Sequence, residues 1–202
     1  MWVNNPLNSR LASYKVWQLL VALKVGLKIP DTLITNNVRA FKPFDKTHPS
    51  LVGKVVNATP TTSPKRLVPT RLVDSVLRSN LNALRLAPVQ FQERIMKDSD
   101  VRVNVVGEKV FATSILSKHV DMRLDLEKSE HQPHELPEKV RLACLELCEN
   151  LGLRFGAIDL LAAKGEYYFL EVNPNGKWGW IEEATRQPIA EAFATLLTSP
   201  SS

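Results

Sequence analysis

The residues best suited to chemistry are three oxygen-bearing side chains, Asp159, Glu171 and Asn173, in two apolar stretches near the C-terminus. Residues two apart in a strand point to the same side, so Glu171 and Asn173 project together from the end of the second stretch. Carboxylate and carboxamide oxygens placed in this way can bind a hard cation such as Mg²⁺, which keeps waters or phosphates in its other positions. The spacing therefore predicts a metal site at a strand end.

The hairpin between the two stretches decides whether Asp159 joins the other two residues. A loop of three residues, 164–166, sets Asp159 directly opposite Glu171, whereas a two-residue turn sets it against Leu170 and spoils the site. Three-residue loops that contain glycine are common in hairpins, and we therefore expect the longer loop.

Each of the three residues also has a simpler interpretation. Glu171 and Asn173 could cap a turn, since Asx turns before glycine are frequent, and Asp159 could be a solvated residue of an amphipathic strand. The apolar neighbours of these residues favour the metal site. An unpaired carboxylate beside a core costs free energy, and a bound cation offsets this cost.

The composition is that of a globular protein. The 202 residues are 44% hydrophobic and 23% charged, with a formal charge of +5 and a pI of about 9.3. The size allows one sizeable core or two small lobes. The charge suits a phosphate-bearing ligand or an acidic peptide, but equally a generic basic surface. Because Lys and Arg are scattered and no aromatic-basic RNA motif is present, nucleic acid is the less favoured partner.

Two features bear on the setting of the protein. The sequence has no apolar N-terminal signal segment and no run of 18 apolar residues, so we expect no membrane partner. Cys144 and Cys148 lie four apart at helical spacing, which favours core packing over a disulfide, and no second cysteine pair is present for zinc. We expect a soluble, cytoplasmic protein.

The hydrophobic pattern predicts an α+β fold, in which strands joined partly by hairpins carry attached helices. Helices are expected at 9–26 (with Gly26 as C-cap), 137–150 and 189–197. Strands are expected at 29–35, 51–57, 89–95, 100–107, 109–117, 153–162 and 167–174. The pattern favours a loop at 58–66, a strand and then a helix at 67–86, and a strand end followed by a loop at 119–137.

Two runs, VQFQERIMKDSDVRVNVVGEKVFATSI and GAIDLLAAKGEYYFLEVNPNGKWGWIEE, resemble the ATP-grasp superfamily, and the resemblance extends from about Trp2 to Leu197. It is strongest to the peptide-modifying ligases of graspetide (microviridin-type) biosynthesis and more distant to the ribosomal-protein glutamate ligases. The motif D…E-x-N-P-x-G is typical of the superfamily, and D-x-R-x-x-V-V-G and WIEE are typical of the subgroup. The resemblance implies two α+β subdomains with antiparallel sheets around a nucleotide cleft, expected at residues 1–90 and 91–202.

The resemblance also implies roles for individual residues. It makes Asp159, Glu171 and Asn173 the ligands of the Mg²⁺ ions that bridge the ATP phosphates. It places Lys15 and Lys54 at the phosphates, and Gln92, Glu93, Arg94 and Ile95 around the adenine. It makes Arg102 and Arg123 catalytic groups that face the phosphates or the substrate carboxylate.

Some of these residues also have a physical reading of their own. Arg102 shares a strand face with Asn104, where a guanidinium suits phosphate or carboxylate, although a solvent-facing arginine is an equal alternative. Lys54 lies in an apolar strand and there needs an anion, whereas Lys15 is by default a surface lysine. Tryptophans 178 and 180 are expected to pack under the loop after the metal strand. Histidines 48, 119, 131 and 134 show no ligand spacing and are assigned no role.

The implied activity is an ATP-dependent ligase. A substrate carboxylate would attack the γ-phosphorus of ATP, and an amine or hydroxyl would then displace phosphate from the acyl phosphate to give an amide or ester. The implied substrate is a ribosomal precursor peptide with acidic side chains, which a basic chain attracts.

Two departures from the family leave an alternative open. Relatives carry a domain of roughly a hundred residues before the matching part, which this chain is expected to lack. Residues 57–66 are rich in Pro, Ser and Thr where many relatives have a glycine-rich flap over the phosphates. The chain could therefore be a truncated or accessory protein that binds nucleotide or peptide without catalysis. A homo-oligomer or a partner chain could also supply the missing lobe.

Overall fold

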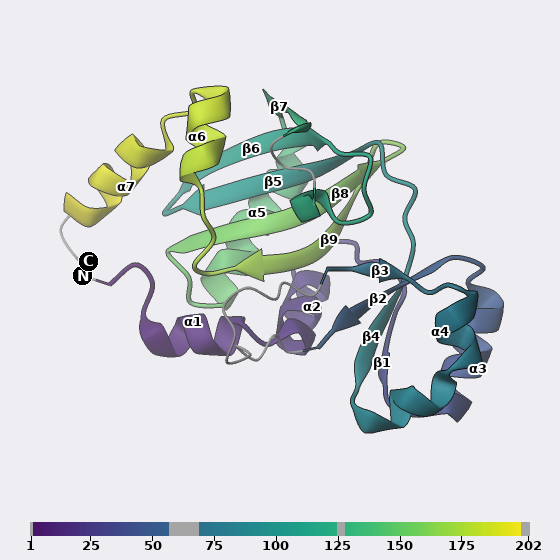
Figure 1. The fold of residues 1–202 in the computed structure, drawn as a ribbon. Helices are drawn as coiled ribbons and strands as arrows, with labels where there is room; N and C mark the ends of the chain where they lie inside the picture. Colours follow the sequence, from purple (N-terminus) through teal and green to yellow (C-terminus); the bar gives the residue numbers. More distant parts are fainter. Residues whose placement is uncertain (1, 57–68, 125–127, 199–202) are drawn as a thin grey trace. The chain divides into compact units, whose positions relative to one another are not determined.

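The computed structural model describes residues 2–56, 69–124 and 128–198, which fall into two compact units (Figure 1). Unit 1 comprises Met1–Ile29, Lys97–Ser117 and Glu127–Ser202, and unit 2 comprises Pro30–Met96 and Lys118–Leu126. This division differs from the expected boundary between residues 90 and 91, because the N-terminal helices pack with the C-terminal strands. The loop expected at 58–66 lies outside the described residues.

Unit 1 is built on a five-stranded antiparallel sheet in the order β7-β6-β5-β8-β9. Its strands are β5 (Ser99–Val106), β6 (Lys109–Leu116), β7 (Glu130–Pro133), β8 (Phe155–Ala163) and β9 (Glu166–Asn173). Strand β7 falls in a stretch expected to be a loop. Pairing with β6 forms it without an apolar pattern, as an edge strand allows.

Five helices accompany this sheet among the described residues. They are α1 (Pro6–Ala12), α2 (Lys15–Lys24), α5 (Glu138–Asn150), α6 (Gly179–Thr185) and α7 (Ile189–Thr198). Helices α2 and α5 pack on the sheet face that carries Val101, Val103 and Val105, and this packing forms the main core. A smaller cluster joins α6 and α7 to residues at one end of β5 and β8, namely Val106, Phe155 and Ala157.

The single helix expected at 9–26 is broken, and this prediction was wrong. Helix α1 ends at Ala12, and α2 begins at Lys15 after an extended Tyr14. The Ala12 carbonyl accepts a hydrogen bond from the side chain of Gln18 (2.6 Å). A side-chain donor thus satisfies a carbonyl at the end of α1.

The hairpin between β8 and β9 closes through two residues, so the expected three-residue loop was also wrong. Ala163 pairs with Glu166, and both Lys164 (φ 51°) and Gly165 (φ 79°) have positive φ, as a two-residue hairpin of type I′ requires. A β-bulge at Leu170 then shifts the register by one residue, so that Asp159 still lies opposite Glu171.

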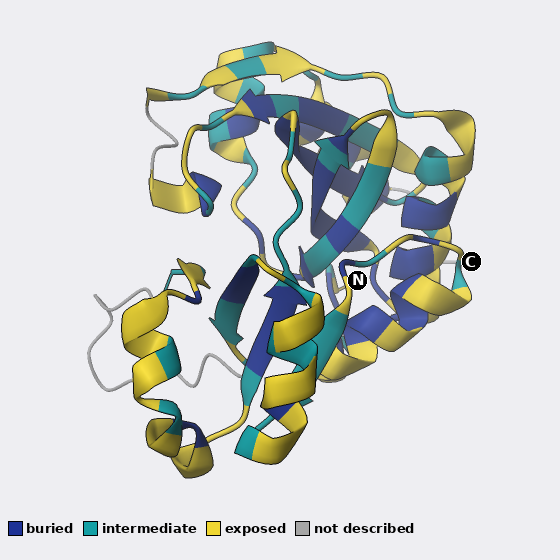
Figure 2. Ribbon diagram, turned by 90° about the vertical axis from the view of Figure 1, so that its right-hand side faces the viewer, coloured by how far each residue is buried: buried dark blue, intermediate teal, exposed yellow. Residues whose placement is uncertain are grey.

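Unit 2 is built on a four-stranded sheet in the order β1-β4-β2-β3. Its strands are β1 (Thr32–Thr35), β2 (Leu51–Val55), β3 (Arg71–Leu72) and β4 (Val89–Glu93). Its helices are α3 (Val38–Thr47), α4 (Ser75–Ser79) and the 3₁₀ helices η1 (Leu81–Leu86) and η2 (Met122–Leu124). The core contains Phe41, Leu51 and Phe91, and the helices expose their outer faces (Figure 2).

Candidate functional site

Three charged side chains form a row across β5, β8 and β9 in unit 1. Arg102 lies opposite Asp159, and Asp159 lies opposite Glu171. Arg102 Nε is 2.7 Å from Asp159 Oδ1, and the two side chains are only 10% and 11% exposed. The register therefore confirms the expected juxtaposition of the two carboxylates and adds an arginine to it.

Glu171 has a basic partner of its own from the N-terminal part of the chain. Lys15, the first residue of α2, places Nζ 2.9 Å from Glu171 Oε2, and the side chains are 21% and 27% exposed. Lys15 was a phosphate contact by resemblance alone, and the structure brings it to a predicted metal ligand. Both carboxylates are thus close to a positive charge, which offsets the cost of holding them beside a core.

The second row of the same sheet face contains Asn104, Ala157 and Asn173. Asn173 Oδ1 accepts a hydrogen bond from the backbone N–H of Asn175 (2.9 Å), so the Asx turn of the simpler interpretation does form. A carboxamide oxygen has a second lone pair, and the turn leaves it able to bind a cation. Asn104 is fully buried, and neither polar atom of its side chain has a hydrogen-bond partner among the described residues.

The turn after β9 lies close against the sheet. A Cβ atom at Gly176 would come within 2.3 Å of Ala157 Cβ and 3.6 Å of Arg102 Nη1. Glycine is needed here for close approach.

The two tryptophans after this turn have different surroundings. Trp178 stacks on Phe193 at 5.0 Å between ring centroids, which confirms its packing role. Trp180 donates its indole N–H to the Lys177 carbonyl, and Arg102 Cζ lies 5.9 Å from its ring centroid. Arg102 therefore has a carboxylate and an aromatic face as neighbours, which restricts its orientation.

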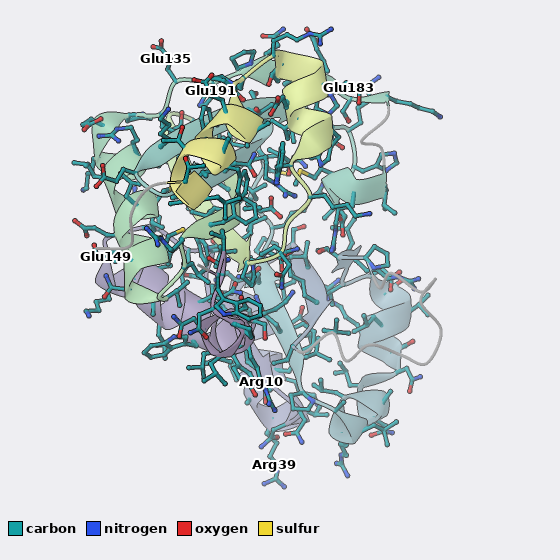
Figure 3. The ribbon with its side chains drawn as sticks, turned by 90° about the vertical axis from the view of Figure 1, so that its left-hand side faces the viewer. Arg10, Arg39, Glu135, Glu149, Glu183 and Glu191 are labelled. Carbon is teal, nitrogen blue, oxygen red and sulfur yellow. The ribbon has the colours of Figure 1, made fainter. Side chains whose placement is uncertain are left out.

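The basic and acidic groups of this site differ from the ordinary surface charges of the molecule. Exposed side chains such as those labelled in Figure 3 project from the ribbon. They are Arg10, Arg39, Glu135, Glu149, Glu183 and Glu191.

In unit 2, Lys54 and Gln92 belong to neighbouring strands of the same sheet. Lys54 lies opposite Gln90 in the β2–β4 pairing, and Gln92 lies two residues further along β4, on the same face. Gln92 is fully buried and donates to Thr32 Oγ1 (3.0 Å), while its Oε1 has no partner among the described residues. This sheet face therefore carries an amine and an acceptor that is without a protein partner in the described part of the chain.

The backbone of the expected adenine linker is partly used within the protein. The N–H of Glu93 donates to the Asp31 carbonyl (2.9 Å), and the N–H of Arg94 donates to the Ser50 carbonyl (3.0 Å). These two N–H groups are therefore occupied, and a nucleotide would need other backbone groups of the stretch, such as those of the half-buried Ile95.

Arg123, the other predicted catalytic residue, is bound to a neighbour within unit 2. Its Nε and Nη2 donate to the two carboxylate oxygens of Asp121 at 2.8 and 2.6 Å, and Asp121 also accepts from the N–H of Thr70. Burial on its own raises the pKa of Asp121, but the bonds from Arg123 and Thr70 outweigh it and lower this pKa to about 2.

A cluster that sequence reasoning missed contains Asp31, His48 and Glu93. His48 Nε2 lies 3.1 Å from Asp31 Oδ2, and Nδ1 lies 2.9 Å from the Phe44 carbonyl. The carbonyl, followed by Asp31, raises the pKa of His48. Within this cluster Asp31 and His48 are already partners of each other. The residues lie 17 and 45 positions apart, so spacing gave no signal.

Cys144 and Cys148 are both buried and unoxidised, as the helical spacing predicted. Burial raises the pKa of the Cys144 thiol to about 12 and that of Cys148 further, so neither is a nucleophile at neutral pH.

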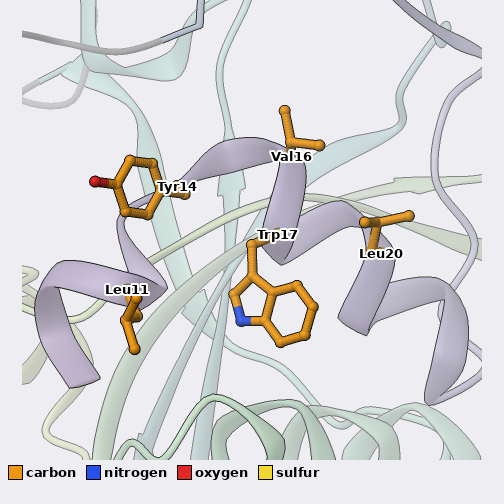
Figure 4. A pocket seen from close by; sticks show the side chains of 5 residues that line it. All are labelled: Leu11, Tyr14, Val16, Trp17 and Leu20. Atoms are coloured by element: carbon orange, nitrogen blue, oxygen red, sulfur yellow. The ribbon is translucent and has the colours of Figure 1, made fainter. Parts of the chain in front are cut away.

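The outer face of the N-terminal helices is apolar and hollowed. Leu11, Tyr14, Val16, Trp17 and Leu20 line a depression of about 450 Å³ (Figure 4), and their exposed fractions lie between 45% and 58%. Helix α2 is therefore apolar both toward the core and away from it, a pattern usual for helices covered on both sides.

The fold and the charged row define an ATP-grasp protein. Residues 13–197 match the RimK-like ATP-grasp domain, and the chain belongs to this family. No curated protein matches it in sequence. Among the described residues, no helix has the length and apolar character needed to cross a membrane.

Solved structures similar to the chain include peptide-modifying enzymes. The macrocyclase MdnC of Microcystis aeruginosa MRC, bound with precursor peptide MdnA, is 33% identical with a TM-score of 0.86, over 98% of this chain and 64% of MdnC. The RiPP-associated ATP-grasp ligase of Chryseobacterium gregarium, in complex with ADP and a leader and core peptide, is 30% identical with a TM-score of 0.86, over 98% and 63%. The D-alanine–D-alanine ligase of Bacillus anthracis, 20% identical with a TM-score of 0.69 over 96% and 67%, shares the fold.

These comparisons confirm the α+β ATP-grasp fold and the resemblance to peptide ligases. The chain spans less than two thirds of the length of the two peptide-modifying relatives.

Proposed function

We propose that the protein is an ATP-dependent ligase that activates a peptide carboxylate as an acyl phosphate and transfers it to an amine or hydroxyl. The observation that carries this proposal is the row of Arg102, Asp159 and Glu171, with Lys15 at its end, in a chain of the RimK-like ATP-grasp family. The row combines the acidic groups that bind a cation with the basic groups that bind phosphate.

Asp159, Glu171 and Asn173 fit Mg²⁺, because their oxygens lie in adjacent rows on one face of two paired strands. When bound, the cation would neutralise phosphate charge during transfer. Arg102 has further donors besides the Nε that lies beside Asp159, and these would bind a phosphate or the substrate carboxylate. Once a cation binds Glu171, Lys15 would leave this carboxylate and bind a phosphate oxygen instead.

In unit 2 we assign nucleotide binding to Lys54 and to residues 92–95. The Oε1 of Gln92, which has no partner in the described part of the chain, is an acceptor for the amino group of adenine, and this bond would remove the cost of a buried unpaired oxygen. Lys54, on the same sheet face, would bind a phosphate. Arg123, which Asp121 holds in place, would act on phosphate or substrate.

The proposed substrate is a ribosomal precursor peptide with acidic side chains. Two similar proteins were crystallised with precursor, leader or core peptides. The formal charge of +5 favours encounter with an acidic peptide. We further propose that the protein works in the cytoplasm, where ATP is present, as a homo-oligomer or with a partner chain.

Calorimetric titration of a non-hydrolysable ATP analogue, with and without Mg²⁺, tests the proposal. Wild type should bind the analogue more tightly with Mg²⁺, and Glu171→Gln should lose this dependence. Glu166→Gln is the matched control, because Glu166 lies on the same strand and also pairs with a lysine. If folded wild type binds no nucleotide under either condition, an accessory protein without turnover becomes the better account.

A further inference from the structure

Strand β9, which carries two of the predicted metal ligands, has backbone groups at its edge that bond to a side chain instead of to another strand. Strand β9 is the last strand of its sheet. On its outer side Lys28 forms an isolated bridge and accepts a hydrogen bond from the Phe169 N–H (2.7 Å), but no strand of the described residues lies beside Val172. At Val172, between Glu171 and Asn173, Gln18 takes this place. Its Oε1 accepts from the Val172 N–H (3.0 Å), and its Nε2 donates to the Val172 carbonyl (2.8 Å).

Gln18 is itself held rigidly. It is only 3% exposed, and its Nε2 also donates to the Ala12 carbonyl at the break between α1 and α2. Lys15, one turn earlier on the same helix, contacts Glu171. The start of α2 therefore holds two consecutive residues of the strand, one through its side chain and one through its backbone.

A second buried carboxamide holds the turn beyond Asn173. Asn4, 7% exposed, donates from Nδ2 to the carbonyls of Pro174 (2.9 Å) and Phe155 (2.8 Å). Its Oδ1 accepts from the N–H groups of Phe155 (2.8 Å) and Arg154 (2.7 Å). Pro174 is the residue that follows Asn173, so Asn4 ties the end of the ligand strand to the start of β8.

We infer that Gln18 and Asn4 are positioning residues, which fix the backbone on both sides of Asn173 and thereby set the spacing of the metal ligands. This inference rests on the proposed function, since it takes Glu171 and Asn173 as ligands. Groups that orient ligands in this way typically change metal affinity about 10- to 100-fold when removed. A buried network in which every atom is bonded is also rigid.

The test is Gln18→Met, which keeps the length of the side chain and removes both bonds to Val172. We expect backbone hydrogen exchange at Val172 to accelerate and the affinity of the ADP complex for Mn²⁺, used as a probe, to fall about 10-fold. Binding of ADP without metal should not change. Asn8→Ala is the matched control, because it removes an attachment of the same segment, to the Gly152 carbonyl, that does not involve β9.

Two results would overturn the inference. One is a lower melting temperature with unchanged Mn²⁺ affinity and unchanged Val172 exchange, which would make Gln18 a purely structural anchor. The other is an equal loss of Mn²⁺ affinity in Asn8→Ala. If Gln18→Met fails to fold, Gln18→Glu keeps the acceptor for the Val172 N–H but turns a carboxylate oxygen toward the Ala12 and Val172 carbonyls, so Mn²⁺ affinity is again expected to fall.

Failure of the proposed function gives a different pattern. Wild type would then bind no Mn²⁺ with ADP, which would overturn the metal role of the two carboxamides. The exchange measurement at Val172 would still report whether Gln18 holds the strand.

Discussion

The two ends of β9 carry the same ion pair in different surroundings. At the hairpin end, Lys28 lies 2.9 Å from Glu166, and at the exit end, Lys15 lies 2.9 Å from Glu171. The first pair is about half exposed, at 55% and 52%, and the second is 21% and 27% exposed. Arg102, Asp159 and Gln18 crowd only the exit end. Distance alone therefore does not identify the functional pair, whereas burial and neighbours do.

The turns at the two ends of β9 also differ in how closely they are packed. Gly165, in the hairpin, has nothing within 4 Å of the position of a Cβ atom and is required by its φ of 79°. Gly176, in the exit turn, is required by contact with Ala157. The hairpin end is open, and the exit end is packed.

The largest expected effect separates a buried ion pair from an exposed one. Arg102→Met leaves Asp159 buried without its arginine and should lower the free energy of unfolding by about 3 kcal/mol. Lys28→Met, its exposed counterpart, should leave the free energy of unfolding nearly unchanged. Urea unfolding monitored by circular dichroism measures both. Equal losses in the two variants would show that burial does not distinguish the two ends.

The glycines should give the next largest difference. Gly176→Ala introduces a methyl group with no room and should cost about 2 kcal/mol of stability and weaken metal-dependent nucleotide binding. Gly165→Ala should cost about 1 kcal/mol, through its positive φ, with binding unchanged. Gly165→Asn, which tolerates this conformation, should recover part of the loss. Thermal unfolding and calorimetry distinguish these cases, and weaker binding by Gly165→Ala would contradict the contrast.

Replacing Lys15 or Lys28 should distinguish the two ends of β9 by the affinity for metal and nucleotide. Lys15→Met removes a positive charge that competes for Glu171, so binding of Mn²⁺ alone should strengthen a few-fold. Binding of the nucleotide should weaken, also a few-fold, because a phosphate contact is lost. Lys28→Met should change neither affinity. The decisive result is that the affinity for Mn²⁺ rises while the affinity for nucleotide falls. A fall in both affinities would show that Lys15 does not compete with the cation.

The smallest effect concerns pH at the hairpin end, where His134 Nε2 lies 2.7 Å from Tyr167 Oη. Burial lowers the pKa of His134 below the ordinary 6.5, so the folded state takes up the proton less readily than the unfolded chain. Stability is therefore full above pH 6.5 and falls as the pH drops toward the folded-state pKa. His134→Gln should show a shallower decline over this interval in chemical unfolding at a series of pH values. An unchanged slope would argue against this assignment.

Sequence reasoning was most successful where a pattern repeats along the chain. The alternation in β5 predicted that Arg102 and Asn104 share one face, and the valines of the opposite face, Val101, Val103 and Val105, lie in the main core. The strands β8 and β9 and the helices α5 and α7 were likewise visible in their apolar periods. Such patterns reflect burial on one side, which local sequence records.

The features that were missed depend on partners far away in sequence. Gln18 bonds to a strand 154 positions away, and its signal was no more than a glutamine on the buried side of a helix. Asn4 had no signal at all. Strand β7 forms through its pairing with β6 despite a polar sequence.

The bulge at Leu170 has a consequence for how this hairpin can change over evolution. Phe169 and Val172 both face the main core although they lie three apart, because the extra residue resets the alternation between them. An insertion in the Lys164-Gly165 turn would displace Glu171 from Asp159, and a deletion at Leu170 would restore the pairing. Hairpin length and strand length should therefore vary together among related sequences, as paired insertions and deletions that leave the acidic residues in place.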